Sequence, residues 1–292
     1  MRFLRFLFRE LFLRGIVFAI LGTLILSGLY LLSIGATPQD SLEAFKSFFM
    51  LISGAPSAHP GFSSGQIIAS GAAITLPLAL MSLIILIIIA LIGSSYAVTS
   101  RYLASHHGYM GPEHFDNFLS LLTSIFAAVP LFVGFWSISV FFSDGAPYLV
   151  IAFLTVVLGG LAWDATDFLK TDMLSQVEST HAIVYSTLGH SLGRFFPLPG
   201  TYSGYLFSSC LPRFIPYLAG KVPAIIGSVT IAEIIFSFQG LGSTLLDSLN
   251  NPNNKDLLIA SVFILLCVNA VVSFLVKTVL FLIYPRWYEK AI

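Results

Sequence analysis

A single carboxylate in an apolar stretch is the first candidate for chemistry in this chain. Glu233 opens the stretch "EIIFSFQGLG", which contains glycines at Gly240 and Gly242. A carboxylate is costly among apolar residues, so it usually faces a cavity, a partner or the surface. Glu233 could line the mouth of a pathway, accept backbone N–H bonds from the turn that follows, or be solvated. We favour the second role, in which both glycines provide positive φ or a close helix approach.

A second group of carboxylates lies where a long apolar run ends, at Asp164, Asp167 and Asp172. Carboxylates in membrane helices can relay protons or cations, as in secondary transporters. The alternative is an acidic helix end at the membrane edge, with Lys170 as a candidate partner. We interpret the group as this helix end.

The stretch "HHGYMGPEH" carries donor atoms that metals use, at His106, His107, Glu113 and His114. Metal binding needs several ligands that converge in fixed geometry. This stretch is a short Gly-Pro-containing loop, so we predict no metal site.

The sequence contains no Walker loop, no HExxH and no GxSxG, and its two cysteines form no zinc or disulfide pattern. We therefore expect no enzyme and no cofactor bound by this chain.

The elements that position these residues follow from composition. Of the 292 residues, 57% are hydrophobic and only 10% are charged, with a mean hydropathy of +0.91. Soluble domains carry about 25% charged residues, so lipid must be the main solvent here. The apolar runs are continuous rather than alternating, which predicts helices rather than a barrel. The net charge is zero, so no nucleic-acid partner is predicted.

The sequence predicts an all-α integral membrane protein with six transmembrane helices. Each span reaches the roughly 20 residues that cross the hydrocarbon. The spans are Gly15–Ile34, Ala72–Val98, Phe118–Phe142, Pro147–Phe168, Phe214–Phe236 and Leu257–Tyr284. On one side of this topology the connecting segments hold ten Lys and Arg, whereas the other side holds only Lys46 and Lys255. The positive-inside rule therefore places both termini in the cytoplasm.

Three further segments complete the predicted organisation. Residues 1–14, "MRFLRFLFRELFLR", have arginines on one helical face and predict an amphipathic interfacial helix, the alternative being a plain basic flank. The rest of the chain divides into 15–71, the first span with its outer loop, and 72–287, the transmembrane core. Within the core, 169–213 is the longest cytoplasmic segment and the natural place for a partner to bind.

That cytoplasmic segment contains "MLSQVESTHAIVYSTLGHSLGR", in which small residues and glycines recur. It resembles the coupling loop of ABC importer membrane subunits. Two registers fit the family pattern of an aromatic residue followed by a glycine, either His181 with Gly189 or Tyr185 with Gly193. The resemblance implies an ATPase-docking helix around Ala182–Gly193. Its candidate contact residues are His181, Ala182, Tyr185, Gly189, His190 and Gly193.

The opening stretch carries a more specific resemblance. "EIIFSFQGLG" is similar to the Glu-x-x-Phe-x-x-Pro-Gly-Leu-Gly signature of one subfamily, with Gln239 in place of the proline. This subfamily is the first, or B-type, membrane permease of dipeptide, oligopeptide and nickel ABC importers, and Phe236 favours it over the companion C-type. The resemblance covers roughly 72–287 and implies a pathway or gate near five residues, namely Ser124, Pro130, Phe132, Glu233 and Phe236. The outer loop is shorter than is usual in the family, and the fourth span ends without the usual arginines, which leaves the substrate class and the docking detail open.

The resemblance implies a permease subunit of a bacterial inner-membrane importer for peptides or a related solute. The expected partners are a homologous C-type permease, two ABC ATPases that bind ATP and Mg, an extracytoplasmic substrate-binding protein and the lipid bilayer. Replacing Gly189 or Gly193 with a bulky residue is expected to uncouple ATP hydrolysis from transport. Two alternatives remain, a stand-alone secondary transporter that uses Asp164 and Asp167, and a membrane scaffold without a transport role.

Overall fold

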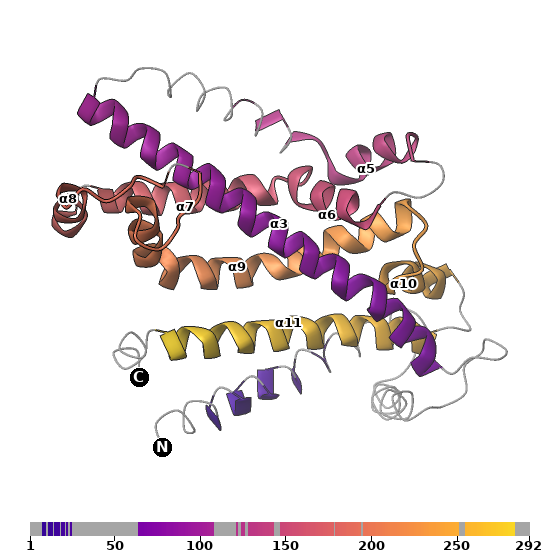
Figure 1. Ribbon diagram of the computed structural model, residues 1–292. Helices are drawn as coiled ribbons and strands as arrows, with labels where there is room; N and C mark the ends of the chain where they lie inside the picture. The colour runs from indigo at the N-terminus through magenta and orange to yellow at the C-terminus, as the bar shows by residue number, and fades with distance from the viewer. Residues whose placement is uncertain are drawn as a thin grey trace. The chain divides into compact units, whose positions relative to one another are not determined.

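The computed structural model describes most of the chain from residue 64 onward (Figure 1). The described residues are 64–107, 121, 124–125, 128–142, 147–177, 179–193, 195–250 and 255–283, with scattered positions between 8 and 24. Their helices are α3 (Ser64–His107), α5 (Leu131–Ser139), α6 (Tyr148–Val157), α7 (Leu161–Val177), α8 (Thr180–Thr187), α9 (Tyr202–Ile235), α10 (Leu241–Asn250) and α11 (Lys255–Ile283). No strand occurs in these ranges, which confirms the all-α prediction for the described part.

Three described helices, α3, α9 and α11, are long and apolar enough to cross a membrane. The pair α6 and α7 adds a fourth candidate if the two helices form one bent span. Most of the predicted first span and a smaller part of the predicted third span lie outside the described residues, as do most of the predicted interfacial helix and outer loop. Six spans with cytoplasmic termini therefore stay a prediction.

The predicted fourth span is bent where a continuous helix was expected. The axes of α6 and α7 meet at 57°. Gly160 has φ +75°, a conformation that favours glycine, and its carbonyl accepts the first backbone bond of α7 from Asp164 at 2.9 Å. After the bend, α7 continues to Val177. Asp164, Asp167 and Asp172 therefore lie along α7 from its first turn onward, rather than at a helix end as predicted, and their position at the membrane edge stays a prediction.

The cytoplasmic segment predicted at 169–213 is also more helical than its sequence suggests. Its start continues α7, and its end from Tyr202 belongs to α9. Three prolines, Pro212, Pro216 and Pro223, lie inside α9 without ending it. Membrane helices tolerate prolines where neighbouring groups satisfy the freed carbonyls. Only α8 and residues 188–201 remain as the connection itself.

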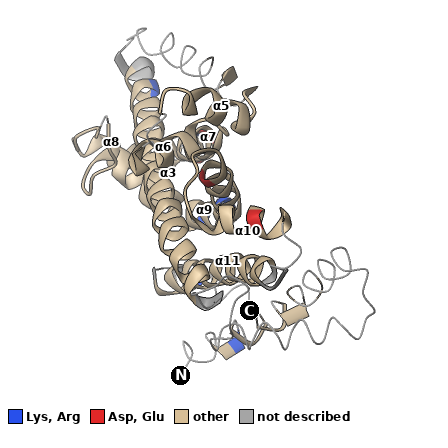
Figure 2. Ribbon diagram, turned by 90° about the vertical axis from the view of Figure 1, so that its right-hand side faces the viewer, with Lys and Arg blue, Asp and Glu red and all other residues tan. Residues whose placement is uncertain are grey.

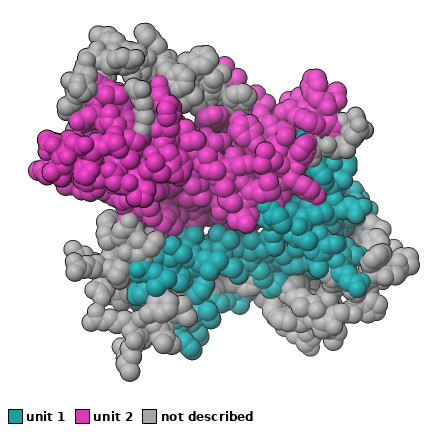
Figure 3. All heavy atoms as spheres, viewed as in Figure 1, with its two compact units in different colours: residues 1–77, 229–292 teal, residues 78–228 magenta. Residues whose placement is uncertain are grey.

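The chain forms two compact units (Figure 3). Unit 1 comprises residues 1–77 and 229–292, and unit 2 comprises residues 78–228. In unit 1, α10 packs against α11, and the buried Leu241 joins Ile68, Leu257 and Ala260 in one apolar cluster. This cluster surrounds the first turn of α10.

In unit 2, small residues allow α3 and α7 to approach closely. A Cβ built on Gly93 would lie 2.6 Å from Cγ2 of Thr166. The buried hydroxyls of Ser82, Ser94 and Thr99 in α3 bond to carbonyls of their own helix, that of Ser82 to the Leu78 carbonyl at 2.9 Å. Small residues at contacts and internally satisfied hydroxyls are the usual packing of membrane helices.

The exposed face of α3 is apolar. Leu80, Ile84, Ile88 and Ile92 follow one another at four-residue spacing and are 58%, 48%, 43% and 42% exposed. Figure 2 shows how sparse Lys, Arg, Asp and Glu are along the helices. An apolar stripe on the outside of a membrane protein is suited to lipid contact.

The turn after α9 contains a non-glycine residue at positive φ. Ser237 has φ +57°, and the next amide, of Phe238, donates to the Glu233 carbonyl at 2.9 Å. This five-residue reach is the Schellman arrangement, in which glycine is the preferred residue at the left-handed position.

We expect Ser237→Gly to raise the free energy of unfolding by about 1 kcal/mol, measured by denaturation in mixed micelles. Ser243→Gly, inside α10, is the control and should be destabilising; a destabilised Ser237→Gly would contradict the assignment.

Candidate functional site

Glu233 lies in the last turn of α9 and is fully buried. Its two carboxylate oxygens have different partners. The Thr75 hydroxyl donates to Oε1 at 2.6 Å, and the backbone N–H of Gly242 donates to Oε2 at 2.8 Å. The first distance is typical of a charge-assisted O–H···O⁻ bond. The carboxylate thus joins α3 and the start of α10 to α9.

Thr75 extends this network to the next amide. Its Oγ1 accepts the Leu241 N–H at 2.9 Å, while the Gly71 carbonyl lies 3.1 Å away as a second acceptor for its proton. Leu241 and Gly242 are the first two residues of α10, and their amides have no partner within that helix. Two other helices therefore supply the cap, with a negative charge at the positive end of the α10 dipole. We call Thr75, Glu233, Gly240, Leu241 and Gly242 the Glu233 cluster.

The glycines of the cluster serve close approach rather than positive φ. Neither Gly240 nor Gly242 is among the residues with positive φ. A Cβ on Gly240 would overlap the Glu233 carboxylate, and a Cβ on Gly242 would lie 2.6 Å from the Thr230 carbonyl oxygen. Gly71 of α3 is equally confined, because its Cβ would lie 3.1 Å from the Leu241 nitrogen. The hydrogen bonds and spaces that the fastening role of Glu233 requires are thus present.

The predicted pathway residues are divided between the units. Phe236 is buried beside the turn in unit 1, as is Glu233. Ser124, Pro130 and Phe132 belong to unit 2. The Pro130 carbonyl accepts the first bonds of α5, from Val133 at 2.9 Å and from Gly134, and Phe132 is 61% exposed. A pathway role for these residues stays a prediction.

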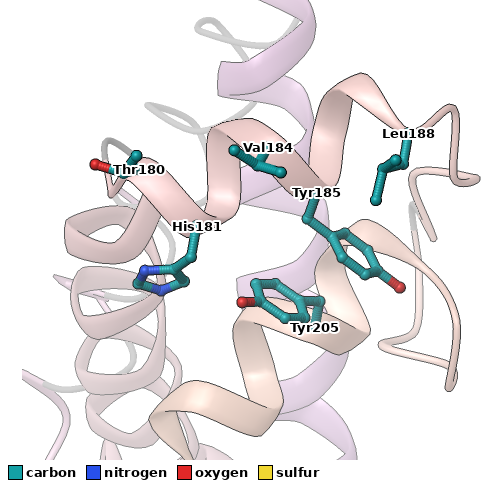
Figure 4. A pocket seen from close by; sticks show the side chains of 6 residues that line it. All are labelled: Thr180, His181, Val184, Tyr185, Leu188 and Tyr205. Carbon is teal, nitrogen blue, oxygen red and sulfur yellow. The ribbon is translucent and has the colours of Figure 1, made fainter.

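In the predicted coupling segment, the Tyr185 ring is stacked between two other rings. Tyr185, in α8, stacks on His190 with ring centroids 4.2 Å apart and on Tyr205 of α9, also at 4.2 Å. His181 meets the Tyr205 ring edge-on at 6.0 Å. Figure 4 shows the His181, Tyr185 and Tyr205 side chains together. α8 is therefore attached to the first turns of α9 through aromatic contacts.

A shallow hollow of about 550 Å³ lies over these rings, which we call the α8 groove. Its lining consists of Thr180, His181, Val184, Tyr185, Leu188 and Tyr205. Val184 is 55% and Leu188 67% exposed, whereas Ala182 is fully buried. Of the predicted docking residues, His181 and Tyr185 line the groove. His190 stacks on the Tyr185 ring, and Ala182 is buried in the protein. The sequence reasoning missed Val184 and Leu188, whose signal was their apolar character in the predicted cytoplasmic segment, and Tyr205, which is distant in sequence.

The two predicted docking glycines have backbone roles. Gly189 has φ +76° and Gly193 has φ +63°. A Cβ on Gly189 would meet nothing within 4 Å, but one on Gly193 would lie 2.7 Å from the Thr201 Cβ. The Ser203 hydroxyl also donates to the Gly193 carbonyl at 2.8 Å. Gly193 is thus enclosed by the start of α9, whereas Gly189 is open.

The acidic group of α7 pairs with α9. Lys221 lies 3.0 Å from Asp164, and Arg213 lies 2.6 Å from Asp172. Between the two pairs, the rings of Phe168 and Tyr217 stack at 4.1 Å. The three contacts are spaced four residues apart on both helices, one turn each. The structure thus gives Asp164 and Asp172 cationic partners that the sequence reasoning did not consider.

No cluster of His, Cys, Asp and Glu that could hold a metal occurs among the described residues. Most of the histidine group at 106–114 lies outside the residues whose side chains are described.

Comparison with protein families places most of the chain in one of them. Residues 102–287, more than half of the chain, match the family model described as "Binding-protein-dependent transport system inner membrane component". No curated protein matches the chain.

Two substitutions at Glu233 separate fastening from a role of its charge in a pathway. A glutamine can still accept the Gly242 N–H, while its amide donates to Thr75 and the Thr75 hydroxyl turns to Gly71. We expect Glu233→Gln to change the free energy of unfolding by at most about 1 kcal/mol. Glu233→Ala leaves a buried amide unpaired and should cost about 2–4 kcal/mol, measured by denaturation in mixed micelles. If Glu233→Gln keeps its stability but loses transport, the charge acts in the pathway instead.

The two coupling-segment glycines should differ in cost. Gly189→Ala should lower the free energy of unfolding only by the strain of the left-handed backbone, about 1–2 kcal/mol. Gly193→Ala carries the same strain and also overlaps Thr201, so its free energy of unfolding should fall by at least about 1 kcal/mol more. Thermal unfolding of both variants in detergent measures the difference. Equal losses would show that the enclosure of Gly193 does not hold in the protein.

Proposed function

Because the chain belongs to the binding-protein-dependent transport system inner membrane component family, we propose that it is the B-type permease subunit of an importer of the dipeptide, oligopeptide and nickel class. In this proposal it forms half of the translocation pathway together with a homologous C-type permease. An extracytoplasmic binding protein delivers the solute to the outer face. Peptides or a related small solute are the expected cargo.

The family itself supports the coarser statements. The chain is a multi-pass membrane permease component of an ABC transporter, and family membership implies the bacterial inner membrane. Permease components of this kind perform transport and are not the ATPase. The family also implies association with other transporter subunits.

The α8 groove is the observation that carries the docking part of the proposal. α8 lies in the predicted cytoplasmic segment, and three apolar side chains of α8 and its C-cap are more than half exposed: Ile183, Val184 and Leu188. Apolar side chains around a shallow hollow favour a protein partner over solvent. In our proposal each permease of the importer receives one ATPase at this groove, and ATP and Mg remain on the ATPases.

The aromatic stack supports a route for the coupling motion. Tyr185 is held between His190 and Tyr205, so α8 is connected directly to α9. A displacement of α8 by the ATPase would therefore tilt α9, which ends in the Glu233 cluster. Because packed interfaces shift between discrete arrangements, such a tilt would exchange outward-open and inward-open states.

A stand-alone secondary transporter remains the second candidate. It would use Asp164, whose side chain is 60% exposed, as part of a relay. The ion pair of Asp164 with Lys221, at 3.0 Å, supports a paired charge more than a relay. Transport by the isolated chain, without any ATPase, would favour this candidate over the importer.

Charged substitutions in the α8 groove test the proposal. Val184→Asp and Leu188→Asp place a carboxylate in the apolar contact, so the ATPases should co-purify at least about tenfold less well. ATP-driven uptake in proteoliposomes should fall in parallel, while the amount of inserted protein stays unchanged. Thr187→Asp, on the same helix but outside the groove lining, is the matched control. Undiminished ATPase recovery with both groove variants would overturn the docking assignment.

A further inference from the structure

The exposed face of α7 in unit 2 is polar along its whole length. Its exposed residues follow at spacings of three and four, at Asp164, Asp167, Thr171 and Ser175. Residues at this spacing share one face of a helix. α7 thus presents hydroxyls and carboxylates outward, in a chain where lipid is the main solvent.

The adjoining face of α9 also lacks large apolar side chains. Within unit 2, the exposed positions of α9 are Ser208, Ser209, Arg213, Pro216, Gly220, Pro223, Ala224 and Gly227. The contrast with α3 of the same unit is direct, because α3 exposes a continuous stripe of leucine and isoleucine. The face formed by α7 and α9 is therefore not built for lipid.

Two ion pairs lie on this face, and they differ in which member is exposed: the carboxylate in one pair and the cation in the other. Asp164 is 60% exposed and its partner Lys221 24%; farther along, Arg213 is 54% exposed and its partner Asp172 11%. The Lys221 ammonium also lies 5.2 Å from the centre of the Tyr217 ring. Both signs of charge are thus accessible from outside the chain. In the pair of Asp164 and Lys221, the Asp164 side chain is the more exposed of the two.

The length of α9 places the ion pair of Asp164 and Lys221 at membrane depth. Its 34 residues span about 50 Å, roughly 20 Å more than the hydrocarbon layer. Lys221 lies about 21 Å from the Ile235 end and about 28 Å from the Tyr202 end. A 30 Å layer placed anywhere along the helix therefore contains Lys221 or has it at the edge.

An exposed ion pair at that depth is costly against lipid, because hydrocarbon neither solvates the charges nor supplies hydrogen bonds. We propose that the face formed by Asp164, Arg213, Gly220 and Lys221 borders the water-filled translocation pathway. We further propose that Asp164 and Lys221 form a subsite for solutes that carry both an ammonium and a carboxylate group. The ammonium group pairs with Asp164 and the carboxylate with Lys221 as the solute passes. This inference rests on the proposed permease function and adds a pathway subsite to it.

Cysteine accessibility tests the water-filled face in the assembled transporter. Gly220 has open space around its Cβ position and no positive φ, so Gly220→Cys should be tolerated. In a background with Cys210→Ala and Cys267→Ala, membrane vesicles are treated with a quaternary-ammonium and with a sulfonate methanethiosulfonate reagent. We expect Gly220→Cys to react with both reagents at least about tenfold faster than Ile88→Cys on the apolar stripe of α3, because thiolate formation needs water.

The same reagents report the two charges. In the Gly220→Cys background, Asp164→Asn should slow the ammonium reagent and accelerate the sulfonate reagent by about threefold or more, and Lys221→Gln should do the reverse. The exchange Asp164→Lys with Lys221→Asp keeps the pair and should restore reactivity with both reagents, which separates a charge effect from misfolding.

Two results would overturn the inference. If Gly220→Cys reacts as slowly as Ile88→Cys, the face is covered by a partner or by lipid. If neither charge substitution alters the ratio of the two rates, the pair is not accessible to passing ions. ATP-driven uptake is measured in the same vesicles, so the permease function can stand while this inference fails.

Discussion

A helix that begins inside a membrane protein has amides that water cannot satisfy, and the start of α10 is organised around this constraint. The first two amides of α10 bond to Thr75 of α3 and Glu233 of α9. The carboxylate has two oxygens and a charge, so it can hold one amide, accept a hydroxyl proton and face the helix dipole at the same time. A side chain at Gly240 or Gly242 would collide with this carboxylate, and one at Gly71 would crowd the backbone at Leu241.

Charges at membrane depth are treated differently in the two units. In unit 1, Glu233 is fully buried and its carboxylate accepts hydrogen bonds from Thr75 and Gly242. In unit 2, the carboxylates of α7 meet cations on α9 at intervals of two helical turns, with stacked rings between them. The first arrangement fixes a turn, whereas the second leaves charged atoms accessible. Burial and pairing thus distinguish a structural carboxylate from one available to a solute.

The sequence predicts much of this because some constraints are local. Continuous apolar runs predict helices, and a glutamate followed by Gly240 and Gly242 predicts a turn that a carboxylate can fasten. Other features depend on tertiary partners. Gly160 bends the fourth span, but a lone glycine in an apolar run does not predict its own φ. Ser237 takes the left-handed position although glycines lie nearby. Tyr205 reaches the α8 groove from a segment that, by sequence alone, leads into the next span.

The length of α3 has a consequence for how the protein meets its bilayer. The part of this helix that qualifies as a candidate span, Gln66–Leu103, has 38 residues and is about 57 Å long. Membrane helices tilt by at most about 40°, and at that tilt a 30 Å layer takes up only about 26 residues. Roughly a dozen residues of this helix must then stand beyond the hydrocarbon. Polar residues near the two ends of the range, such as Gln66, Ser100 and Arg101, suit headgroups or water there, so the thickness of the surrounding bilayer sets how much of α3 lies outside the hydrocarbon.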